Sequence, residues 1–455
     1  MLFFSSTSGQ RYGYDSIGNQ ILCIPERWAE KLEQGDKEGV VTHLQTAGII
    51  ETGGLFFKGP DNDWHKKPGQ LGGLILNVTD ACNLRCTYCA YSKHYPFERA
   101  HGKTMMSFDV AKRSVDLYLA HSQHAPLRSI SIYGGEPSMA KQLVQEVLAY
   151  ARTKSDNLRF SMNSNAVSMP DSWIDFLISE KVALWVSLDG TEPDHDRYRK
   201  DKVGRGTHST VLGNMQRIAE RAPDYYRKNV GFIATLAPPY QLVDLYHFQR
   251  SNPLLRDQVW FINYVKPLDT TFFDAVSSPK CSARIPSHDE QVGHVASDYI
   301  EAAINGEAQT HFGHWVFGDV LKKIHQRSMN PAREVWINGS CTPGRDKLFV
   351  DTKGDFFPCE RSGGFLNLGS HDSGFALDDA AKIVSSYVED CQENCAKCPN
   401  ARFCSACYLA ARRENHLDLT RKYAYCGQRI RDLELGLHIY TSILEKSPMA
   451  FDSWK

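Results

Sequence analysis

The sequence predicts an α/β protein built around a partial (β/α)6 TIM-like barrel. Two observations indicate this fold. Between residues 71 and 270, short apolar runs alternate with longer segments in which apolar residues recur at helical spacing. Polar and glycine-rich motifs directly follow several of these runs. Alternation of this kind is typical of parallel sheets with right-handed crossovers, in which functional residues gather at the carboxyl ends of the strands.

Composition excludes several classes of protein. The chain has 455 residues, enough for two or three domains, and its 42% hydrophobic and 23% charged residues are those of a globular protein. A formal net charge of -1 argues against a nucleic-acid partner. We find neither a membrane-length apolar stretch nor a cleavable signal at the start of the chain, so we expect a cytoplasmic protein without a membrane partner.

The elements of the barrel follow in order along the chain. Strands are predicted over residues 74–78, 129–133, 158–162, 183–188, 230–235 and 259–264, and helices over residues 108–120 and 141–153 between the first of them. Before the barrel we expect a hairpin over residues 14–25 and one or two helices over 26–44. After about residue 270 the strands cease, and residues 289–304 and 317–327 are predicted to be helices.

The 13 cysteines fall into two groups. Three lie together after the first predicted strand, and eight lie after residue 340, while Cys23 and Cys281 stand alone and are expected to be small buried side chains. A chain of this length does not need disulfides for stability, so the odd count favours metal or redox chemistry.

The first group is Cys82, Cys86 and Cys89, with three and then two residues between the thiols. This spacing lets one loop turn three thiolates toward a common point and leaves a fourth coordination position free. Zinc is the alternative, but a structural zinc site takes four protein ligands and no fourth one follows at a typical spacing.

This motif, with the aromatic Tyr88 before its last cysteine, resembles the signature of the radical S-adenosylmethionine (SAM) superfamily. The resemblance implies that the three thiolates hold three irons of a 4Fe-4S cluster and that SAM binds the fourth. One electron from the cluster would then cleave SAM and release a deoxyadenosyl radical.

The same resemblance implies a set of residues that contact SAM. The segment Gly134, Gly135, Glu136 and Pro137 resembles the part of the family that binds the methionine amino group, and Asn163 and Ser187 stand where similar enzymes contact the ribose or carboxylate. Arg199 ends a stretch that resembles a branch of the family with additional clusters. A solvated loop is the alternative for the charged residues around it. The cofactor-binding residues expected are Gly134, Gly135, Glu136, Asn163, Ser187 and Arg199.

The second group of cysteines resembles the SPASM domain, which binds auxiliary iron-sulfur clusters; a zinc ribbon is the alternative for such paired cysteines. The resemblance implies three 4Fe-4S clusters in all. Cys341, Cys359 and Cys407 would hold the inner auxiliary cluster, and its fourth ligand is left open between Cys391, Cys281 and a free iron. The outer cluster would be held by Cys395, Cys398, Cys404 and Cys426.

The N-terminal region faintly resembles the winged-helix-like (RRE/PqqD-like) element that binds the leader of a ribosomally made precursor peptide; an ordinary cap on the barrel is the alternative. We therefore expect four regions. They are a leader-recognition element over 1–70, a radical SAM barrel over 71–270, a helical bridge over 271–335 and a SPASM domain over 336–455.

These resemblances imply a maturase that abstracts hydrogen from a precursor peptide and forms a carbon-carbon, ether or thioether cross-link, with the auxiliary clusters carrying the surplus electron away. A flavodoxin or ferredoxin type of protein would supply electrons. The enzymatic alternative is an anaerobic sulfatase-maturing enzyme that makes formylglycine, in which an Asp follows the cysteine matching Cys359. Here Glu360 takes that place and is the expected catalytic base. A zinc-binding interaction protein without activity is the third hypothesis.

Overall fold

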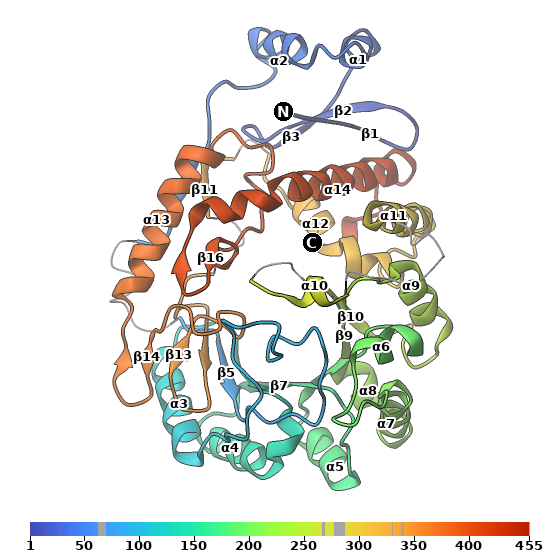
Figure 1. Ribbon diagram of the computed structural model, residues 1–455. Helices are drawn as coiled ribbons and strands as arrows, with labels where there is room; N and C mark the ends of the chain where they lie inside the picture. Colours follow the sequence, from blue (N-terminus) through green and yellow to red (C-terminus); the bar gives the residue numbers. More distant parts are fainter. Residues whose placement is uncertain (62–69, 266–268, 277–286, 330, 338–340, 455) are drawn as a thin grey trace.

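The computed structural model describes residues 1–61, 70–265, 269–276, 287–329, 331–337 and 341–454. A curved sheet of eight strands lies in the lower half of Figure 1, in the order β10-β9-β8-β7-β6-β5-β12-β13. The six predicted strands are confirmed, and neighbouring strands among them are parallel. They are β5 (Gly73–Asn77), β6 (Arg128–Tyr133), β7 (Leu158–Ser164), β8 (Ala183–Ser187), β9 (Val230–Leu236) and β10 (Val259–Tyr264).

The cysteine-rich end of the chain extends this sheet, which the sequence did not predict. β12 (Lys347–Val350) lies parallel to β5, with Lys347 opposite Gly73, and β13 (Phe356–Phe357) continues antiparallel to β12. Both strands are short and lack a following helix, so the βα pattern does not identify them. Their position brings Cys341 and Cys359, which flank these two strands, alongside β5, the strand that leads into the first group.

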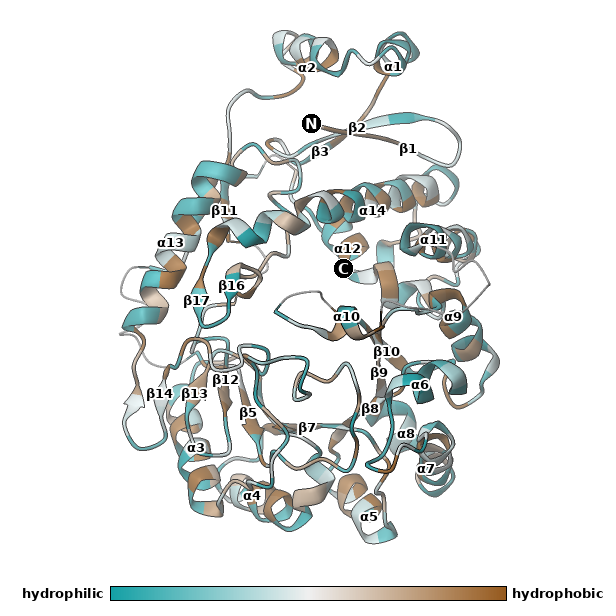
Figure 2. Cartoon of the chain, in the orientation of Figure 1, coloured by the Kyte–Doolittle hydropathy of each residue, from teal (hydrophilic) through white to brown (hydrophobic). Residues whose placement is uncertain are grey.

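Helices cover the outer face of the sheet (Figure 1). Alternate strand residues such as Leu74, Leu76, Ile130 and Ile132 are buried beneath them, and Figure 2 shows the apolar sides of the helices turned toward these strands. Ser107 accepts a hydrogen bond from the backbone of Val110 and so begins the first helix. The helices are α3 (Phe108–His121), α4 (Lys141–Lys154), α5 (Asp171–Ser179), α6 (Glu192–Tyr198), α7 (His208–Arg221), α8 (Pro223–Asn229) and α9 (Leu242–Ser251).

The inner face of the sheet is half-exposed and largely polar. Ser131, Tyr133, Asn163 and Ser187 occupy the strand positions that alternate with the buried ones. Ser131 and Ser161 face each other on β6 and β7 and their hydroxyl oxygens lie 2.7 Å apart. This polar wall is consistent with a partial barrel whose interior receives a bound molecule.

The N-terminal region is a three-stranded antiparallel sheet with two helices above it (Figure 1). The predicted hairpin and helices are confirmed as β2 (Arg11–Asp15), β3 (Gln20–Cys23), α1 (Glu26–Glu33) and α2 (Lys37–Thr46), and β1 (Leu2–Ser5) completes the sheet. One face packs Phe3 and Leu22 against α1 and α2, while the other face places Phe4 and Tyr14 in the main core.

The rest of the chain closes the upper side of the barrel. The predicted helices at 289–304 and 317–327 are confirmed as α11 (His288–Ile304) and α12 (Gly313–His325), and α14 (Cys426–Lys446) packs against both. Among the described helices, none is long and apolar enough to cross a membrane. The remaining elements are β4 (Phe56–Lys58), α10 (Phe272–Val276), β11 (Glu334–Trp336), β14 (Gly369–Ser370), β15 (Gly374–Phe375), α13 (Asp378–Cys395), β16 (Arg412–Arg413) and β17 (His416–Leu417).

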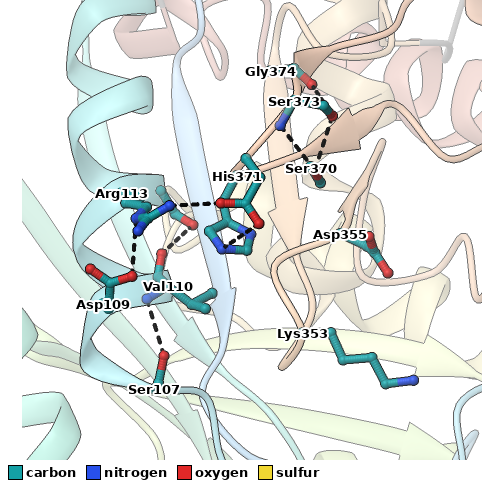
Figure 3. A network of polar contacts seen from close by, with 12 residues as sticks. Ser107, Asp109, Val110, Arg113, Lys353, Asp355, Ser370, His371, Ser373 and Gly374 are labelled. Carbon is teal, nitrogen blue, oxygen red and sulfur yellow. Dashed lines mark hydrogen bonds and ion pairs between the residues drawn. The ribbon is translucent and has the colours of Figure 1, made fainter.

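Polar contacts join the hairpin formed by β14 and β15 to helix α3 of the barrel. Arg113 on α3 bonds Asp109 on its own helix, at 3.0 Å, and Asp372 of the hairpin, at 2.7 Å. Figure 3 shows His371 beside Arg113, and Ser370 and Ser373 bonded to each other across the turn. These contacts help to hold residues on either side of the hairpin against the sheet.

Candidate active site

The loop after β5 carries Cys82, Cys86 and Cys89 at the carboxyl edge of the sheet. Backbone N–H groups aim at two of the sulfurs: Leu84 donates to the Sγ of Cys82 and Tyr91 to the Sγ of Cys89, both at 3.4 Å. Such donors stabilise thiolates and the sulfurs of iron-sulfur clusters. The loop is therefore shaped to present sulfur ligands.

The three thiols lie close enough to influence one another. Burial, together with a smaller effect of the charge of Cys86, raises the pKa of Cys82 to about 12 and that of Cys89 to about 11. A metal that binds here displaces these protons. Among the described residues no three ligating side chains converge on the place of a single metal ion. In a cluster each thiolate binds a different iron, so its ligands stand farther apart, and the donor set fits such a group.

A second segment holds this loop in place. Arg85 donates its backbone N–H to Lys200 at 2.8 Å, and Thr87 donates to Tyr198 at 3.2 Å. The solvated-loop alternative for the charged residues is thus wrong at Tyr198 and Arg199, which are buried. The run of charged residues therefore contains a segment, residues 198–200, that pairs with the cysteine loop.

Arg199 lies in a buried polar cluster beside this loop. Its Nε donates to Asp189 Oδ2 at 2.9 Å, and Tyr88 donates its hydroxyl to the same oxygen. The backbone N–H of Thr235 donates to the other oxygen of Asp189 at 2.9 Å. Burial raises the pKa of Cys86, while the charge of Arg199 lowers it. Asp189 was not predicted as a site residue, although it follows Ser187 in the motif at the end of β8.

Gly134 and Gly135 let the end of β6 cross the start of the cysteine loop. The N–H of Gly135 donates to the carbonyl of Thr79 at 2.7 Å, and the N–H of Glu136 donates to Ala81 at 2.8 Å. A Cβ on Gly135 would lie 2.4 Å from the carbonyl oxygen of Ala81, and Gly134 has a φ of 155°. Both positions therefore require glycine.

Glu136 is buried and already carries three hydrogen bonds. Its carboxylate accepts from the backbone of Ser138 at 3.0 Å, from the hydroxyl of Ser164 at 2.7 Å and from the backbone of Asn165 at 2.7 Å. It thereby ties the end of β6 to the end of β7. The expected contact of Glu136 with SAM stays a prediction, and its visible role is to position these two loops.

Asn163 and Ser187 lie half-buried on the inner face at the ends of β7 and β8. Sequence reasoning missed their neighbour Asn165, whose amide donates to Asn83 Oδ1 at 2.7 Å and lies 3.9 Å from the Sγ of Cys82. Asn165 stands just beyond the end of β7 and is buried, so the pattern of the strand did not indicate it.

The predicted inner auxiliary cysteines also come together. Cys341, Cys359 and Cys407 surround the buried side chain of Tyr408, whose pKa is raised by burial and by all three thiols. Burial raises the pKa of Cys341 and of Cys359 to about 11. These three thiols form the inner group.

The predicted outer cysteines form a third set, the outer group, of Cys395, Cys398, Cys404 and Cys426. Burial raises the pKa of Cys398, and the charges of the other three raise it further. Cys391 lies with this group: a hydrogen bond from it lowers the pKa of Cys395 to about 7. The structure thus separates Cys391 from the inner group, while Cys281 lies outside the described residues.

A cluster of side chains around Tyr133, the Tyr133 cluster, links the first three thiols to the inner group. The Arg99 guanidinium lies 5.5 Å from the ring centre of Tyr91, whose backbone bonds Cys89, and Arg99 also contacts Glu360, which follows Cys359. Burial raises the pKa of Tyr133, as do the charges of Tyr91, Glu360 and Cys89, while the charge of Arg99 lowers it. The Glu360 carboxylate lies 3.3 Å from the ammonium of Lys347. Sequence reasoning predicted Glu360 but missed the residues that face it.

Arg99 is the unusual member of this cluster. Its Nη2 donates to the backbone carbonyl of Glu360 at 2.5 Å, and its guanidinium lies 4.1 Å from the ring centre of Phe349. Its Nε and Nη1 are buried and form no well-aligned hydrogen bond with a described residue, although the guanidinium lies near enough to the Tyr91 hydroxyl to oppose the rise that burial causes in the pKa of Tyr91. Buried donors of this kind are costly unless something accepts from them, so they can bind a carbonyl or carboxylate.

Comparison with known proteins agrees with this geometry. Residues 76–237 match the Radical SAM superfamily. A cysteine-type anaerobic sulfatase-maturating enzyme of Clostridium novyi is 21% identical over 75% of this chain and 88% of its own length. A protein of the same description from Clostridium perfringens strain 13 is 24% identical over 78% and 93%.

Among solved structures, native anSMEcpe with bound AdoMet and Cp18Cys peptide covers 81% of this chain and 98% of its own at 19% identity, with a TM-score of 0.58. This likeness concerns the fold. The hypothesis of a zinc protein without activity is overturned by the family match and by the enzymes among the relatives. Residues 76–237 thus form a Radical SAM domain, which implies a 4Fe-4S cluster and SAM. The thiol-bearing loop of residues 82–89 fits these groups, and the chain is a radical SAM enzyme with sulfatase-maturating enzymes among its relatives.

Proposed function

We propose that this enzyme oxidatively matures a ribosomally made precursor peptide by joining two of its side chains. The observation that carries the proposal is the Tyr133 cluster, whose contacts link the first three thiols to the inner group. A substrate there would face the SAM-binding loop on one side and an electron acceptor on the other. The peptide in the solved anSMEcpe complex and the maturating enzymes among the relatives support a peptide substrate.

When bound, the three proposed clusters and SAM would supply a hydrogen-abstracting radical and an exit for one electron. The chain's own residues have separate tasks. Cys82, Cys86 and Cys89 would hold the first cluster, and the inner and outer groups would hold the auxiliary ones. Gly134, Gly135, Glu136, Asn163, Ser187 and Arg199 are the proposed contacts of SAM or the supports of its pocket.

Glu360 is the proposed base that takes a proton from the substrate. Lys347 holds its carboxylate at 3.3 Å, and the backbone carbonyl of Glu360 is fixed by Arg99. A base held by two contacts keeps its orientation as the substrate binds. The Nε and Nη1 of Arg99 would donate to a backbone carbonyl or a carboxylate of the peptide beside this base.

The N-terminal region supports a role in binding a leader. β1 and β3 are the edges of its sheet, and a groove beside β1 is lined by Leu2, Phe3 and Val41, with Glu434 of α14 on its far side. An extended leader could add as a further strand along such an edge. The electron donor is proposed to be a flavodoxin or ferredoxin, and the location the cytoplasm, which keeps thiols reduced.

Formylglycine formation is the second candidate, and the names of the relatives favour it. The reconstituted enzyme should therefore be incubated with SAM, a reductant and either a precursor peptide or a sulfatase peptide. A cross-linking enzyme removes two hydrogens from the precursor without making an aldehyde. An aldehyde that reacts with a hydrazide, formed on the sulfatase peptide alone, would instead establish formylglycine formation and end the first proposal.

The leader site is better tested by a point variant than by deletion of residues 1–70. Tyr14 packs on Phe403 at 5.5 Å between ring centres, so removal of the region would expose the main core. Val41→Glu places a charge in the groove and should weaken binding of a labelled leader. The same kind of change on the outside of α7, Gln216→Glu, is the control. Equal leader affinity in both variants would argue for an ordinary cap.

A further inference from the structure

Lys422 is a lysine buried beside the outer group of thiols. Only 2% of the residue is exposed, and it lies one helical turn before Cys426. Lysine is almost never fully buried unless its charge is paired, because removing an ammonium from water is costly. This buried lysine therefore requires a physical reason.

Its surroundings fix the ammonium in one place. The Nζ donates to the Sγ of Cys391 at 3.4 Å and forms an ion pair with Asp390. The rings of Tyr387 and Tyr423 lie 4.5 Å and 5.2 Å from it, and the hydroxyl of Tyr423 donates to Asp390 at 2.7 Å. Carboxylate, thiol and two aromatic faces all favour the charged form of the lysine.

The positive charge reaches the proposed cluster ligands. Cys391, which the ammonium contacts, stands one helical turn before Cys395 on α13, and the Sγ of Cys426 lies 3.9 Å from the backbone carbonyl oxygen of Lys422. The inner group has its own cation, because the charge of Lys347 opposes the rise that burial causes in the pKa of Cys341 and of Cys359. Each auxiliary group thus has one buried or half-buried lysine, and the described contacts of Lys422 include neither Glu360 nor Arg99.

We propose that Lys422 sets the reduction potential of the cluster held by the outer group. That cluster gains one electron, and with it one negative charge, when it is reduced. A fixed ammonium beside its ligands stabilises the reduced form, so the potential rises and the cluster accepts an electron more readily. Lys422 keeps its proton throughout and is a positioning residue for electron transfer. The inference rests on the proposed assignment of the outer cluster.

Two substitutions with opposite expected effects test this role. Lys422→Met removes the positive charge and should lower the midpoint potential of the outer cluster. Asp390→Asn removes the opposing carboxylate and should raise it. A purely structural role would disturb the cluster in the same way in both variants, since both break the same ion pair. Lys422→Arg keeps the charge and should stay close to the parent protein.

The measurement is a reductive titration followed by electron paramagnetic resonance on reconstituted full-length protein. Cys82→Ala, Cys86→Ala and Cys89→Ala are present in every sample, so that auxiliary clusters alone give signals. Lys347→Met is the matched control and should leave the outer signal in place. Shifts of equal sign in Lys422→Met and Asp390→Asn, or none with iron content intact, would overturn the inference.

If Lys422→Met loses iron, its potential cannot be compared with that of the parent protein. Asp390→Asn and Lys422→Arg, which both keep the positive charge at residue 422, then provide the test. An unshifted potential in Asp390→Asn would then count against the inference. A different result would show that the outer group holds no cluster. In that case, replacing Cys398 and Cys404 by Ala would remove no signal from the spectrum of the parent protein.

Discussion

His195 is a buried histidine that holds the polar cluster around Asp189 in place. Its Nδ1 accepts the backbone N–H of Asp189 at 3.3 Å, and its Nε2 lies 3.1 Å from the hydroxyl of Thr207. Burial, with a smaller contribution from the nearby charge of Arg199, lowers its pKa from 6.5 to about 2. The folded protein therefore holds this imidazole neutral.

A histidine whose pKa is depressed on folding contributes stability above its unfolded pKa, and this contribution is lost as the pH falls. For His195 the loss begins near pH 6.5 and continues toward pH 2, at up to about 1.4 kcal/mol per pH unit. The slope should become shallower in His195→Asn, as measured by urea unfolding between pH 5 and pH 7. The exposed His416→Asn should keep the parent slope. Identical slopes in all three proteins would contradict the assignment.

Arg99 is predicted to bind the peptide. Two of its nitrogens form no hydrogen bond with a residue that the structure describes. Arg99→Met should therefore remove a charge-assisted hydrogen bond to the peptide, which contributes about 1.5–3 kcal/mol. This loss corresponds to a roughly 10- to 100-fold rise in KM for a peptide that the enzyme modifies. The KM of Arg99→Lys should lie between those of the parent enzyme and Arg99→Met. Arg431 is exposed, so Arg431→Met serves as the control. An unchanged KM in Arg99→Met would show that water or another protein group satisfies these donors.

The sequence indicated the residues that a local motif contains, but not the partners that folding brings to them. Spacing alone indicated Cys82, Cys86 and Cys89, and the neighbouring glycines stood in a short motif. Glu136 was expected to face SAM, whereas its hydrogen bonds to Ser164 and Asn165 join residues 28 and 29 positions apart. Contacts of this range depend on strand order, which no local pattern contains.

At the scale of elements, the crossing of β6 over the cysteine loop depends on Gly135. A Cβ there would meet the backbone oxygen of Ala81 at 2.4 Å, and backbone cannot turn aside as a side chain can. Gly135→Ala should therefore lower the free energy of unfolding by about 1–3 kcal/mol. Gly213 on α7 has no atom within 4 Å of the place that an added methyl group would take, so Gly213→Ala should instead raise it by up to about 1 kcal/mol. Equal changes in the free energy of unfolding for Gly135→Ala and Gly213→Ala, measured by chemical unfolding, would refute the close crossing.

Elements of the barrel were predictable from their periodicity, whereas the two longest described helices, α13 and α14, were not predicted. Six strands and four long helices were predicted within a few residues, because their apolar residues repeat over a turn or more. β12 and β4 were missed. β12 becomes a strand because it pairs with β5, and β4 because it pairs with β11. In both cases the partner lies far away in the chain.

At the scale of the whole molecule, the outer group and the N-terminal sheet are joined. Arg402, between Cys398 and Cys404, donates to the carbonyl oxygens of Ser16 at 2.6 Å and Ile17 at 2.9 Å. The turn between β2 and β3 therefore rests on the loop that carries two of the proposed ligands. A peptide bound at the N-terminal sheet would lie on the same body as the auxiliary thiols, which suits an enzyme that must hold a long substrate during radical chemistry.

The central claim is that Cys82, Cys86 and Cys89 hold a cluster with one iron free for SAM. Electron paramagnetic resonance of the reduced, reconstituted protein tests it most directly, with and without SAM. The account predicts a change in one cluster signal on addition of SAM, and its absence when the three cysteines are replaced by Ala while the auxiliary signals remain. A SAM-dependent change that survives the triple replacement, or no change in the parent protein, would contradict it.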